Sequence, residues 1–196
     1  MLLITDRHHL DSPLLRNSAP HDKSNSVMLL HIRAATVDDL PSILEIYNDA
    51  IRNTTAVYSY DPVTLANRLE WFQTKQQHNY PVLVAETDSE TNARVIGFSS
   101  YGAFRAWDAY LHTVENSIYV HPNYRGQGVG KQLLSSLIEQ ANTQNIHVIV
   151  AGIDAVNQAS IRLHQSFGFV QVAHFKEVGF KFDRWLDLVF MQLILQ

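Results

Sequence analysis

Three glycines that alternate with other residues point to a binding site for an anion. Gly126, Gly128 and Gly130 lie in the segment RGQGVGKQLL, between a predicted strand and a predicted helix. Glycine has no Cβ to keep a ligand away from the backbone, and the first turn of a helix leaves N–H groups unpaired. Such a turn favours phosphate, although a flexible turn is the alternative. The spacing matches neither the dinucleotide motif G-x-G-x-x-G nor a P-loop, since Gln132 follows Lys131.

The segments before this loop alternate between helical and strand patterns. Thr36 and Asp39 have the spacing of a capping box, which predicts a helix over residues 36–51. A second helix is predicted over residues 64–77, after the turn at Asp61-Pro62. Strands are predicted over residues 31–35, 80–87, 94–104 and 114–120. The short turn after residue 87 predicts a hairpin, and residues 106–113 are expected to form a loop.

The segments after the loop alternate more regularly. Residues 131–144 predict an amphipathic helix with one apolar stripe, formed by Val129, Leu133, Leu134, Leu137, Ile138 and Ala141. Residues 147–153 predict a buried strand, residues 157–169 a helix that ends at Gly168, and residues 185–195 a long closing strand. Hairpins followed by alternating helices and strands predict one α/β domain with a mixed sheet.

Composition narrows the class of protein. The 196 residues are 46% hydrophobic with a formal net charge of −4, which suits one globular domain and argues against nucleic acid as a partner. There is no cysteine, no apolar run of about 18 residues and no signal peptide, so we expect a soluble cytoplasmic protein without a membrane span. Residues 1–30 have no clear period and are expected to be a poorly ordered extension. Two interpretations stay open: a chain that begins at Met28, or a short N-terminal arm.

Two motifs carry a resemblance to a known family. The glycine loop has the form R/Q-x-x-G-x-G/A, and N-x-x-S-x-x-L-H-x-x-x-G-F runs from Asn157 to Phe169. Together they resemble the GCN5-related N-acetyltransferases. Segments such as YPVLVAE, TVENSIYVHPNYRGQGVG and VGFKFDRWLDLVFMQL are similar to the phosphinothricin and methionine sulfoximine N-acetyltransferases. The resemblance covers residues 32–195, with one departure at Asp183, where glycine is expected.

The resemblance implies a fold and a co-substrate. The expected fold is a single acetyltransferase domain over residues 31–196, with a mixed, mostly antiparallel sheet, flanking helices and a splayed central strand pair. The co-substrate is acetyl-CoA, whose thioester and pantetheine are expected to lie along the backbone of Ile118, Tyr119 and Val120. Its diphosphate is expected on the loop residues Arg125, Gly126, Gln127, Gly128, Val129, Gly130 and Lys131. Asn157 and Ser166 are expected as further cofactor contacts.

Acetyl transfer to an amine demands a base, donors for the thioester oxygen, and a proton for the leaving thiolate. Glu115 begins the strand that leads into the glycine loop, and by resemblance it is the proposed base, often acting through a water. Partial burial would raise its pKa toward neutrality. His164 lies where many relatives have a tyrosine. It is a candidate acid for the thiolate, and the alternative is a histidine that packs or caps.

The acceptor is expected to be a small amine that resembles an amino acid, such as phosphinothricin or methionine sulfoximine. Arg105 is the candidate for its carboxylate, because a guanidinium binds a carboxylate through two hydrogen bonds. Trp107 and Tyr110 are expected to form walls of the same site, with Asp108 and Glu115 beside them. An Arg105 that simply faces solvent is the alternative.

Several alternatives stay open for the whole chain. One is acetylation of protein N-termini or lysines, and another is a non-catalytic module that binds acyl-CoA; the presence of Glu115 argues against the second. The histidines share no ligand spacing, so no metal is expected. The family is usually dimeric, so a homodimer is expected by resemblance.

Overall fold

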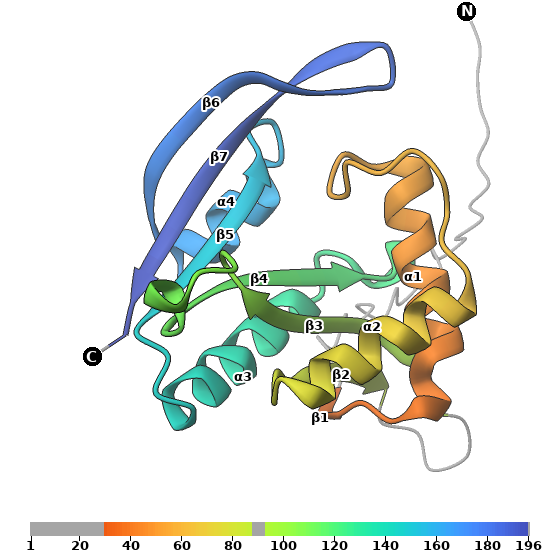
Figure 1. The fold of residues 1–196 in the computed structure, drawn as a ribbon. Coiled ribbons are helices and arrows are strands. Elements are labelled where there is room, and N and C mark those ends of the chain that lie inside the picture. Colours follow the sequence, from red (N-terminus) through yellow and green to blue (C-terminus); the bar gives the residue numbers. More distant parts are fainter. Residues whose placement is uncertain (1–29, 88–92, 196) are drawn as a thin grey trace, which may run out of the picture.

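One twisted sheet of seven strands organises the chain (Figure 1). The computed structural model describes residues 30–87 and 93–195. The strands are β1 (Leu30–Ala34), β2 (Val82–Thr87), β3 (Val95–Ala103), β4 (Thr113–Val120), β5 (Val148–Asp154), β6 (Val170–Lys181) and β7 (Arg184–Ile194). Their order across the sheet is β1-β2-β3-β4-β5-β7-β6. Only β4 and β5 pair in parallel; the other neighbours are antiparallel.

The parallel pair is joined over a short length. Residues 113–115 of β4 pair with residues 148–150 of β5. Beyond that point β4 continues to Val120 and β5 to Asp154, but the two strands no longer pair with each other. The two strands therefore diverge, which confirms the predicted splayed pair. A gap is left in the middle of the sheet, next to the glycine loop.

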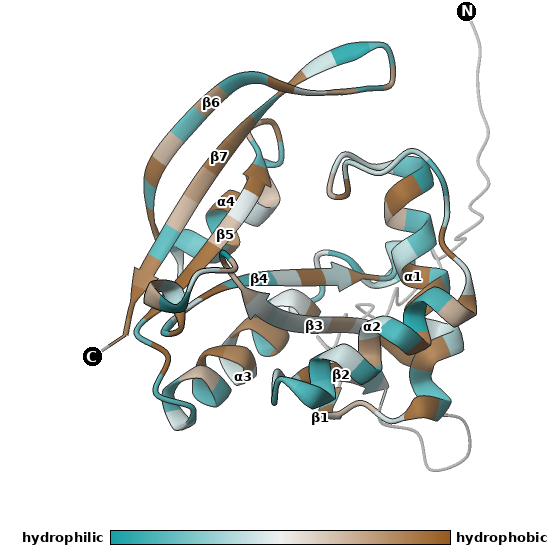
Figure 2. Ribbon diagram, viewed as in Figure 1, coloured by the Kyte–Doolittle hydropathy of each residue, from teal (hydrophilic) through white to brown (hydrophobic). Residues whose placement is uncertain are grey.

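Four helices cover the two faces of the sheet: α1 (Leu40–Asn53), α2 (Leu65–Gln77), α3 (Val129–Thr143) and α4 (Gln158–Gln165). Helices α1 and α2 pack on one face, in a cluster with Val84 and Phe98. Helices α3 and α4 pack on the other face, where the predicted α3 stripe is buried against Val114 and Ile149. Figure 2 shows that α3 has both apolar and polar residues, which alternate along its ribbon as expected for an amphipathic helix. The α/β class and mixed sheet are confirmed.

Local signals explain where the helices begin and end. The capping box forms as predicted: the Thr36 N–H donates to the Asp39 carboxylate over 2.7 Å. The Arg33 guanidinium also donates to that carboxylate, at 2.7 and 2.8 Å. Helix α4 ends at Gln165, and the turn after it includes Gly168, which has a φ of +87°. This is the left-handed conformation that glycine adopts most easily.

One strand was missed by the sequence patterns. Strand β6 forms a long antiparallel hairpin with β7, and it lies at the edge of the sheet. Most of its residues are exposed, so neither face imposes the alternation that marks a half-buried strand. Its register also shifts between Phe175 and Gly179. The closing strand β7 was predicted correctly, but it is an inner strand of the sheet.

Two expectations fall on parts of the chain that the structure leaves undescribed. The N-terminal extension lies almost entirely outside the described residues, as do His8 and His9. Most of the predicted turn between β2 and β3 is also outside them. Within the described residues, no helix is both long enough and apolar enough to cross a membrane.

Candidate active site

A groove of about 700 Å³ opens where β4 and β5 diverge, beside the N-terminus of α3. We call it the glycine-loop groove. Gly126 and Gly128 have φ values of +75° and +86°, a conformation that other residues adopt at a cost. Among the described residues, no acceptor binds the backbone N–H groups of residues 126–130. These N–H groups and the positive end of the helix dipole suit an anionic ligand.

The charges around the groove fit the same ligand. Arg125, Lys131 and Arg184 line it, and no carboxylate of the described residues does. Arg125 is held in place, because its Nε donates to the Val120 carbonyl over 3.1 Å and its Nη2 lies 3.2 Å from Asp49 Oδ2. The groove is therefore electropositive, with backbone donors at one end.

Most of the predicted cofactor residues lie in this groove. Those that line it are Ile118, Tyr119, Val120, Arg125, Gly126, Gly128, Gly130, Lys131 and Asn157. Three others do not. Val129 is buried in the core, and the Gln127 side chain donates to the Asn123 carbonyl. The Ser166 hydroxyl caps α4 by donating to the Leu163 carbonyl over 2.7 Å.

Another serine, Ser160 in the first turn of α4, lies in the groove where Ser166 was expected. Ser160 lines the groove together with Asn157, whose side chain caps α4 by accepting from the Ser160 N–H over 3.1 Å. The motif N-x-x-S-x-x-L-H contains Ser160 itself, so the sequence held the signal for this residue.

The diverging strands also expose backbone groups. The His121 N–H donates to the Ile96 carbonyl of β3, so alternate residues of β4 direct their backbone groups toward β3. By the same alternation, Ile118 and Val120 direct theirs toward the gap. Because the β4–β5 pairing stops at Glu115, these groups have no strand partner there. They can bind an extended ligand that carries amide and carbonyl groups.

A second cavity, of about 460 Å³, lies on the other side of the gap and contains Glu115. We call it the Glu115 cavity. It shares part of its wall with the glycine-loop groove; the shared residues are Thr55, Ala56, Ile118, Tyr119, Asn157 and Ser160. A ligand that passes through the gap would therefore reach from one cavity to the other.

Two glycines lie next to Glu115, and one of them leaves the space that the Glu115 carboxylate occupies. Gly102 is its partner on β3, and Gly152 lies on β5. A Cβ on Gly152 would be 2.9 Å from Glu115 Oε1, which is closer than real Cβ contacts come. The carboxylate therefore occupies space that any other residue would fill. No local sequence pattern marks either glycine.

The environment of Glu115 changes its acidity. Burial raises the pKa of the carboxyl group, and the nearby Arg105 lowers it in part. Among the described residues, no hydrogen-bond donor contacts this carboxylate. Asp154 is the other carboxylate in the cavity wall, but it is buried and accepts from the Val156 N–H. Glu115 is thus the accessible proton acceptor of the cavity.

His164 lies in the wall of the Glu115 cavity but uses both ring nitrogens within the protein. It is 3% exposed; Nδ1 lies 2.8 Å from the Ser160 carbonyl and Nε2 lies 3.1 Å from Asn116 Nδ2. A carbonyl only accepts, so Nδ1 carries the proton and Nε2 accepts from Asn116. Burial lowers the pKa of His164, which favours this neutral form. The geometry supports a packing role, and the acid role stays a prediction.

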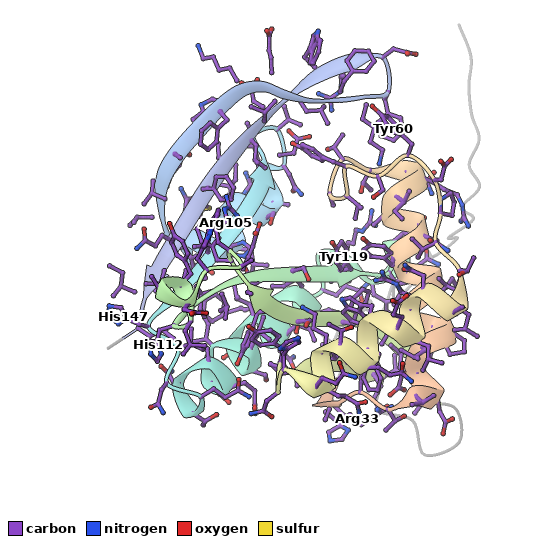
Figure 3. All side chains as sticks on the ribbon, viewed as in Figure 1. Arg33, Tyr60, Arg105, His112, Tyr119 and His147 are labelled. Atoms are coloured by element: carbon purple, nitrogen blue, oxygen red, sulfur yellow. The ribbon has the colours of Figure 1, made fainter. Side chains whose placement is uncertain are left out.

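The loop predicted to hold the acceptor lies outside the cavity walls. Arg105, Trp107, Asp108 and Tyr110 are exposed, Trp107 by 70%, and none of them lines the Glu115 cavity. The Arg105 guanidinium stacks on Phe104 at 4.1 Å from the ring centre. Figure 3 shows Arg105 near the start of β4, whereas Tyr119 is at the other end of that strand. Of these four residues, only Arg105 affects the pKa of Glu115, which it lowers.

The β6–β7 hairpin contributes groove residues that the sequence analysis missed. Phe182 and Arg184 line the glycine-loop groove from the hairpin turn. Phe182 and Asp183 have φ values of +52° and +55°, which suits a two-residue hairpin turn. Aspartate tolerates this conformation better than most residues, so Asp183 can replace the expected glycine without disrupting the turn.

A buried lysine fastens this hairpin to α1 and the residues after it. Lys181 is 3% exposed, and its Nζ donates to the carbonyls of Ile51, Thr54 and Val57 at 2.6, 2.9 and 2.6 Å. These carbonyls belong to the end of α1 and the turn after it. Since residues 54–56 form the opposite wall of the groove, Lys181 fixes the distance between the two walls.

The described residues contain no group of three or more His, Cys, Asp or Glu side chains that could hold a metal ion. The groups that these cavities present are the carboxylate, the cations and the exposed backbone described above. These groups can bind an elongated anionic ligand and remove a proton next to it.

Known proteins share this sequence and fold. The chain is 51% identical to an L-methionine sulfoximine/L-methionine sulfone acetyltransferase of Pseudomonas aeruginosa, over 85% of this chain and 95% of that protein. It is 49% identical to the L-amino acid N-acyltransferase MnaT of Escherichia coli, over 84% and 93% of the two chains. A Sinorhizobium meliloti phosphinothricin acetyltransferase, solved in complex with AcCoA, has 39% identity and a TM-score of 0.81, covering 86% of this chain and 89% of that one.

A family model agrees with these relatives. The model described as the acetyltransferase (GNAT) family matches residues 41–169, which include β4, the glycine loop, α3, β5 and α4. The matched segment thus contains both motifs and the splayed strand pair. Because this model matches more than half of the chain and two of the relatives above are about 50% identical to it, this chain belongs to the GNAT acetyltransferase family.

Proposed function

We propose that this protein transfers the acetyl group of acetyl-CoA to the amine of a small amino acid. The observation that carries the proposal is the meeting of two cavities at the exposed backbone of β4: an electropositive groove on one side and a carboxylate on the other. The relatives at about 50% identity act on methionine sulfoximine and methionine sulfone, so these amino acids are the first acceptors to test. Phosphinothricin is the next.

Acetyl-CoA would lie in the glycine-loop groove, as a cofactor that links the two cavities. Its diphosphate would accept from the N–H groups of residues 126–130 and from Arg125 and Lys131. Its pantetheine would run along β4, where the backbone groups of Ile118 and Val120 face the gap. The thioester would then lie at the narrow end of the gap, close to Glu115.

Glu115 is the proposed general base. It accepts a proton from the acceptor's ammonium group, directly or through one water, and the free amine then attacks the thioester carbon. A C–N bond forms, the C–S bond breaks, and the CoA thiolate leaves as the thiol with the proton that the attacking nitrogen loses. The raised pKa of Glu115 brings it closer to that of the amine, which helps the proton transfer. The free N–H groups of β4 suit the developing oxyanion.

For the acceptor, we propose Arg105 as a residue that acts at the rim of the Glu115 cavity, since its charge reaches Glu115. Trp107, Asp108 and Tyr110 are retained as candidates that would close over a bound acceptor. The cavity of about 460 Å³ suits a small amino acid better than a peptide chain.

We also propose that the protein is a cytoplasmic homodimer with its N-acetyltransferase domain in residues 31–196. The edge strand β6 supports a dimer, because apolar side chains of this hairpin are exposed, including Val172, Phe175 and Phe180. A second copy that covers this surface would bury them. Sedimentation at micromolar concentration would show twice the mass of the chain if the proposal holds, and the mass of one chain if it fails.

The function is tested by mixing the purified protein with acetyl-CoA and one amine at a time, and by following thiol release. Methionine sulfone, methionine sulfoximine and phosphinothricin are compared with other free amino acids and with short peptides. Turnover of small amino acids and none of peptides is expected. Turnover of peptides alone would replace the proposal with a protein acetyltransferase, and release that no amine stimulates would leave only cofactor binding.

A further inference from the structure

Helix α2 brings an amino group into the Glu115 cavity. Lys75 lies in the last turn of α2 and lines this cavity, half-buried. Its Nζ donates to the Tyr101 carbonyl over 2.7 Å, and the rings of Trp71 and Tyr80 lie 5.9 and 5.5 Å from it. The Nζ also occupies the space above Gly102, where a Cβ would be 2.6 Å away.

No anion of the described residues balances this charge. The carboxylates that form ion pairs with described cations are Asp39, Glu45, Asp49, Glu86, Asp154 and Asp187, and none of them pairs with Lys75. The next cation along α2 is Arg68, which lowers the pKa of Lys75 further, after burial, to about 8. A cation that is desolvated without a counter-charge is costly, and an anionic ligand would remove that cost.

We propose that Lys75 binds the α-carboxylate of the amino-acid acceptor while Glu115 receives the proton from its amine. This assignment rests on the proposed function, and it adds the group by which the site distinguishes an amino acid from a simple amine. Tyr101 O uses one of the three donors of Nζ. Two donors are left for a carboxylate.

The distance between the two groups fits an α-amino acid. The Lys75 Nζ lies above Gly102 on β3, and the Glu115 carboxylate leans toward Gly152 on β5. These strands lie on opposite sides of β4, so the two groups are about two strand spacings apart, on the order of 10 Å. An amino acid that is hydrogen-bonded at its amine and at its carboxylate spans about 9 Å.

Both groups lie on the same face of the sheet. Gly102 and Glu115 are directly opposite in the β3–β4 register, and directly opposite residues direct their side chains to one face. Lys75 reaches that face from α2, which packs on it. The absence of a side chain at Gly102 therefore has a specific use here: it leaves room for the lysine and for the acceptor.

The test compares two acceptors that differ in one group: L-methionine sulfone, and its primary amide, in which a neutral carboxamide replaces the carboxylate. The variant Lys75→Gln removes the charge but keeps one N–H donor for the Tyr101 carbonyl. For wild type we expect kcat/KM to favour the acid by at least about ten-fold, as a lost charge-assisted hydrogen bond implies. In Lys75→Gln the preference should fall to about three-fold or less, with the KM for acetyl-CoA unchanged.

The amines of the two acceptors differ in basicity. Comparing the ratio of their kcat/KM values between wild type and variant removes this effect, because it is the same for every variant. Arg94→Gln is the matched control, because Arg94 is an exposed cation just before β3 and lines neither cavity. It should keep the wild-type ratio. Lys75→Arg keeps the charge and should keep most of the preference for the acid.

Gly102→Ala tests the same assignment without changing Lys75. The added methyl group would displace the flexible Nζ rather than backbone, so the fold should be kept and the preference for the acid should weaken. This variant decides the matter if Lys75→Gln proves unstable. The inference is overturned if both variants lower kcat/KM for the acid and for the amide by the same factor, or if wild type shows no preference for the acid. Failure of wild type to acetylate any amino acid would instead overturn the proposed function.

Discussion

Replacing Glu115 with glutamine tests the centre of the proposed mechanism. The change keeps the size of the side chain and its reach into the cavity, but an amide does not accept a proton at neutral pH. General-base catalysis contributes about 10²–10⁴-fold to a rate, which corresponds to about 3–5.5 kcal/mol of the barrier. The structure favours a large effect, because Asp154, the other carboxylate in the cavity wall, is buried and bound to backbone.

The assay is thiol release from acetyl-CoA with methionine sulfone, measured between pH 6 and about 10. We expect kcat of Glu115→Gln to fall by about 10²–10⁴-fold at pH 7 while the KM for acetyl-CoA changes little. Raising the pH should partly restore the variant, because more of the acceptor is then already a free amine. The wild type should show a rising limb near neutral pH that the variant lacks.

The thermal stability of Glu115→Gln should change in the opposite direction to its activity. The folded-state pKa of Glu115 is raised, so the folded protein holds its proton more tightly than the unfolded chain does. Its charge therefore lowers stability as pH rises through the raised pKa, and glutamine removes that loss. At pH 7 the Tm of Glu115→Gln should equal or exceed that of wild type, and the difference should vanish in acid. Near-normal turnover at pH 7 in a folded variant would refute the role of Glu115.

Three further substitutions test the groove, its clamp and the histidine. Gly128→Val should weaken acetyl-CoA binding at least about ten-fold, as measured by calorimetry. Because Gly128 has a φ of +86°, this change should also lower the free energy of unfolding by about 1–2 kcal/mol, which Gly128→Asn should recover because asparagine tolerates this φ. An unchanged affinity of Gly128→Val for acetyl-CoA would contradict the phosphate site. Lys181→Met leaves the carbonyls that Lys181 binds without this donor, so the free energy of unfolding should fall by about 3 kcal/mol and Tm by about 10 °C. An unchanged Tm would show that these three hydrogen bonds, which we call the clamp, are dispensable for stability. His164→Gln should lower Tm but change kcat by less than about ten-fold at pH 7, whereas a loss of about 10²-fold at unchanged Tm would restore its role as an acid.

The sequence predicted the fold well where a pattern repeats over many residues. The apolar stripe of α3, the capping box at Thr36 and the β2–β3 hairpin are local signals, and all three form as expected. Strand β6 was missed because an exposed edge strand lacks the alternation that burial imposes. The splayed pair followed from the resemblance, since no local pattern states where two strands stop pairing.

The site was less predictable for a physical reason: its contacts join residues that are far apart in the chain. Glu115 stands out by its position before the glycine loop, but the space that its carboxylate occupies depends on Gly152, which looks like an ordinary strand glycine. Lys75 is a polar residue near the end of a mostly polar helix, and such residues usually face solvent. Its direction into the cavity depends on how α2 packs on the sheet, which one sequence does not encode locally.

The clamp at Lys181 changes how the gap in the sheet should be viewed. The strands β4 and β5 meet at residues 113–115, and the hairpin reaches α1 across their open ends, where Tyr60 also donates to the Phe180 carbonyl over 2.7 Å (Figure 1). The gap is therefore a closed ring rather than an open V. A long, thin cofactor enters a ring by threading or by waiting for the ring to open. We therefore predict that the exchange of coenzyme A for acetyl-CoA depends on how often the clamp opens, so that Lys181 affects the rate of turnover.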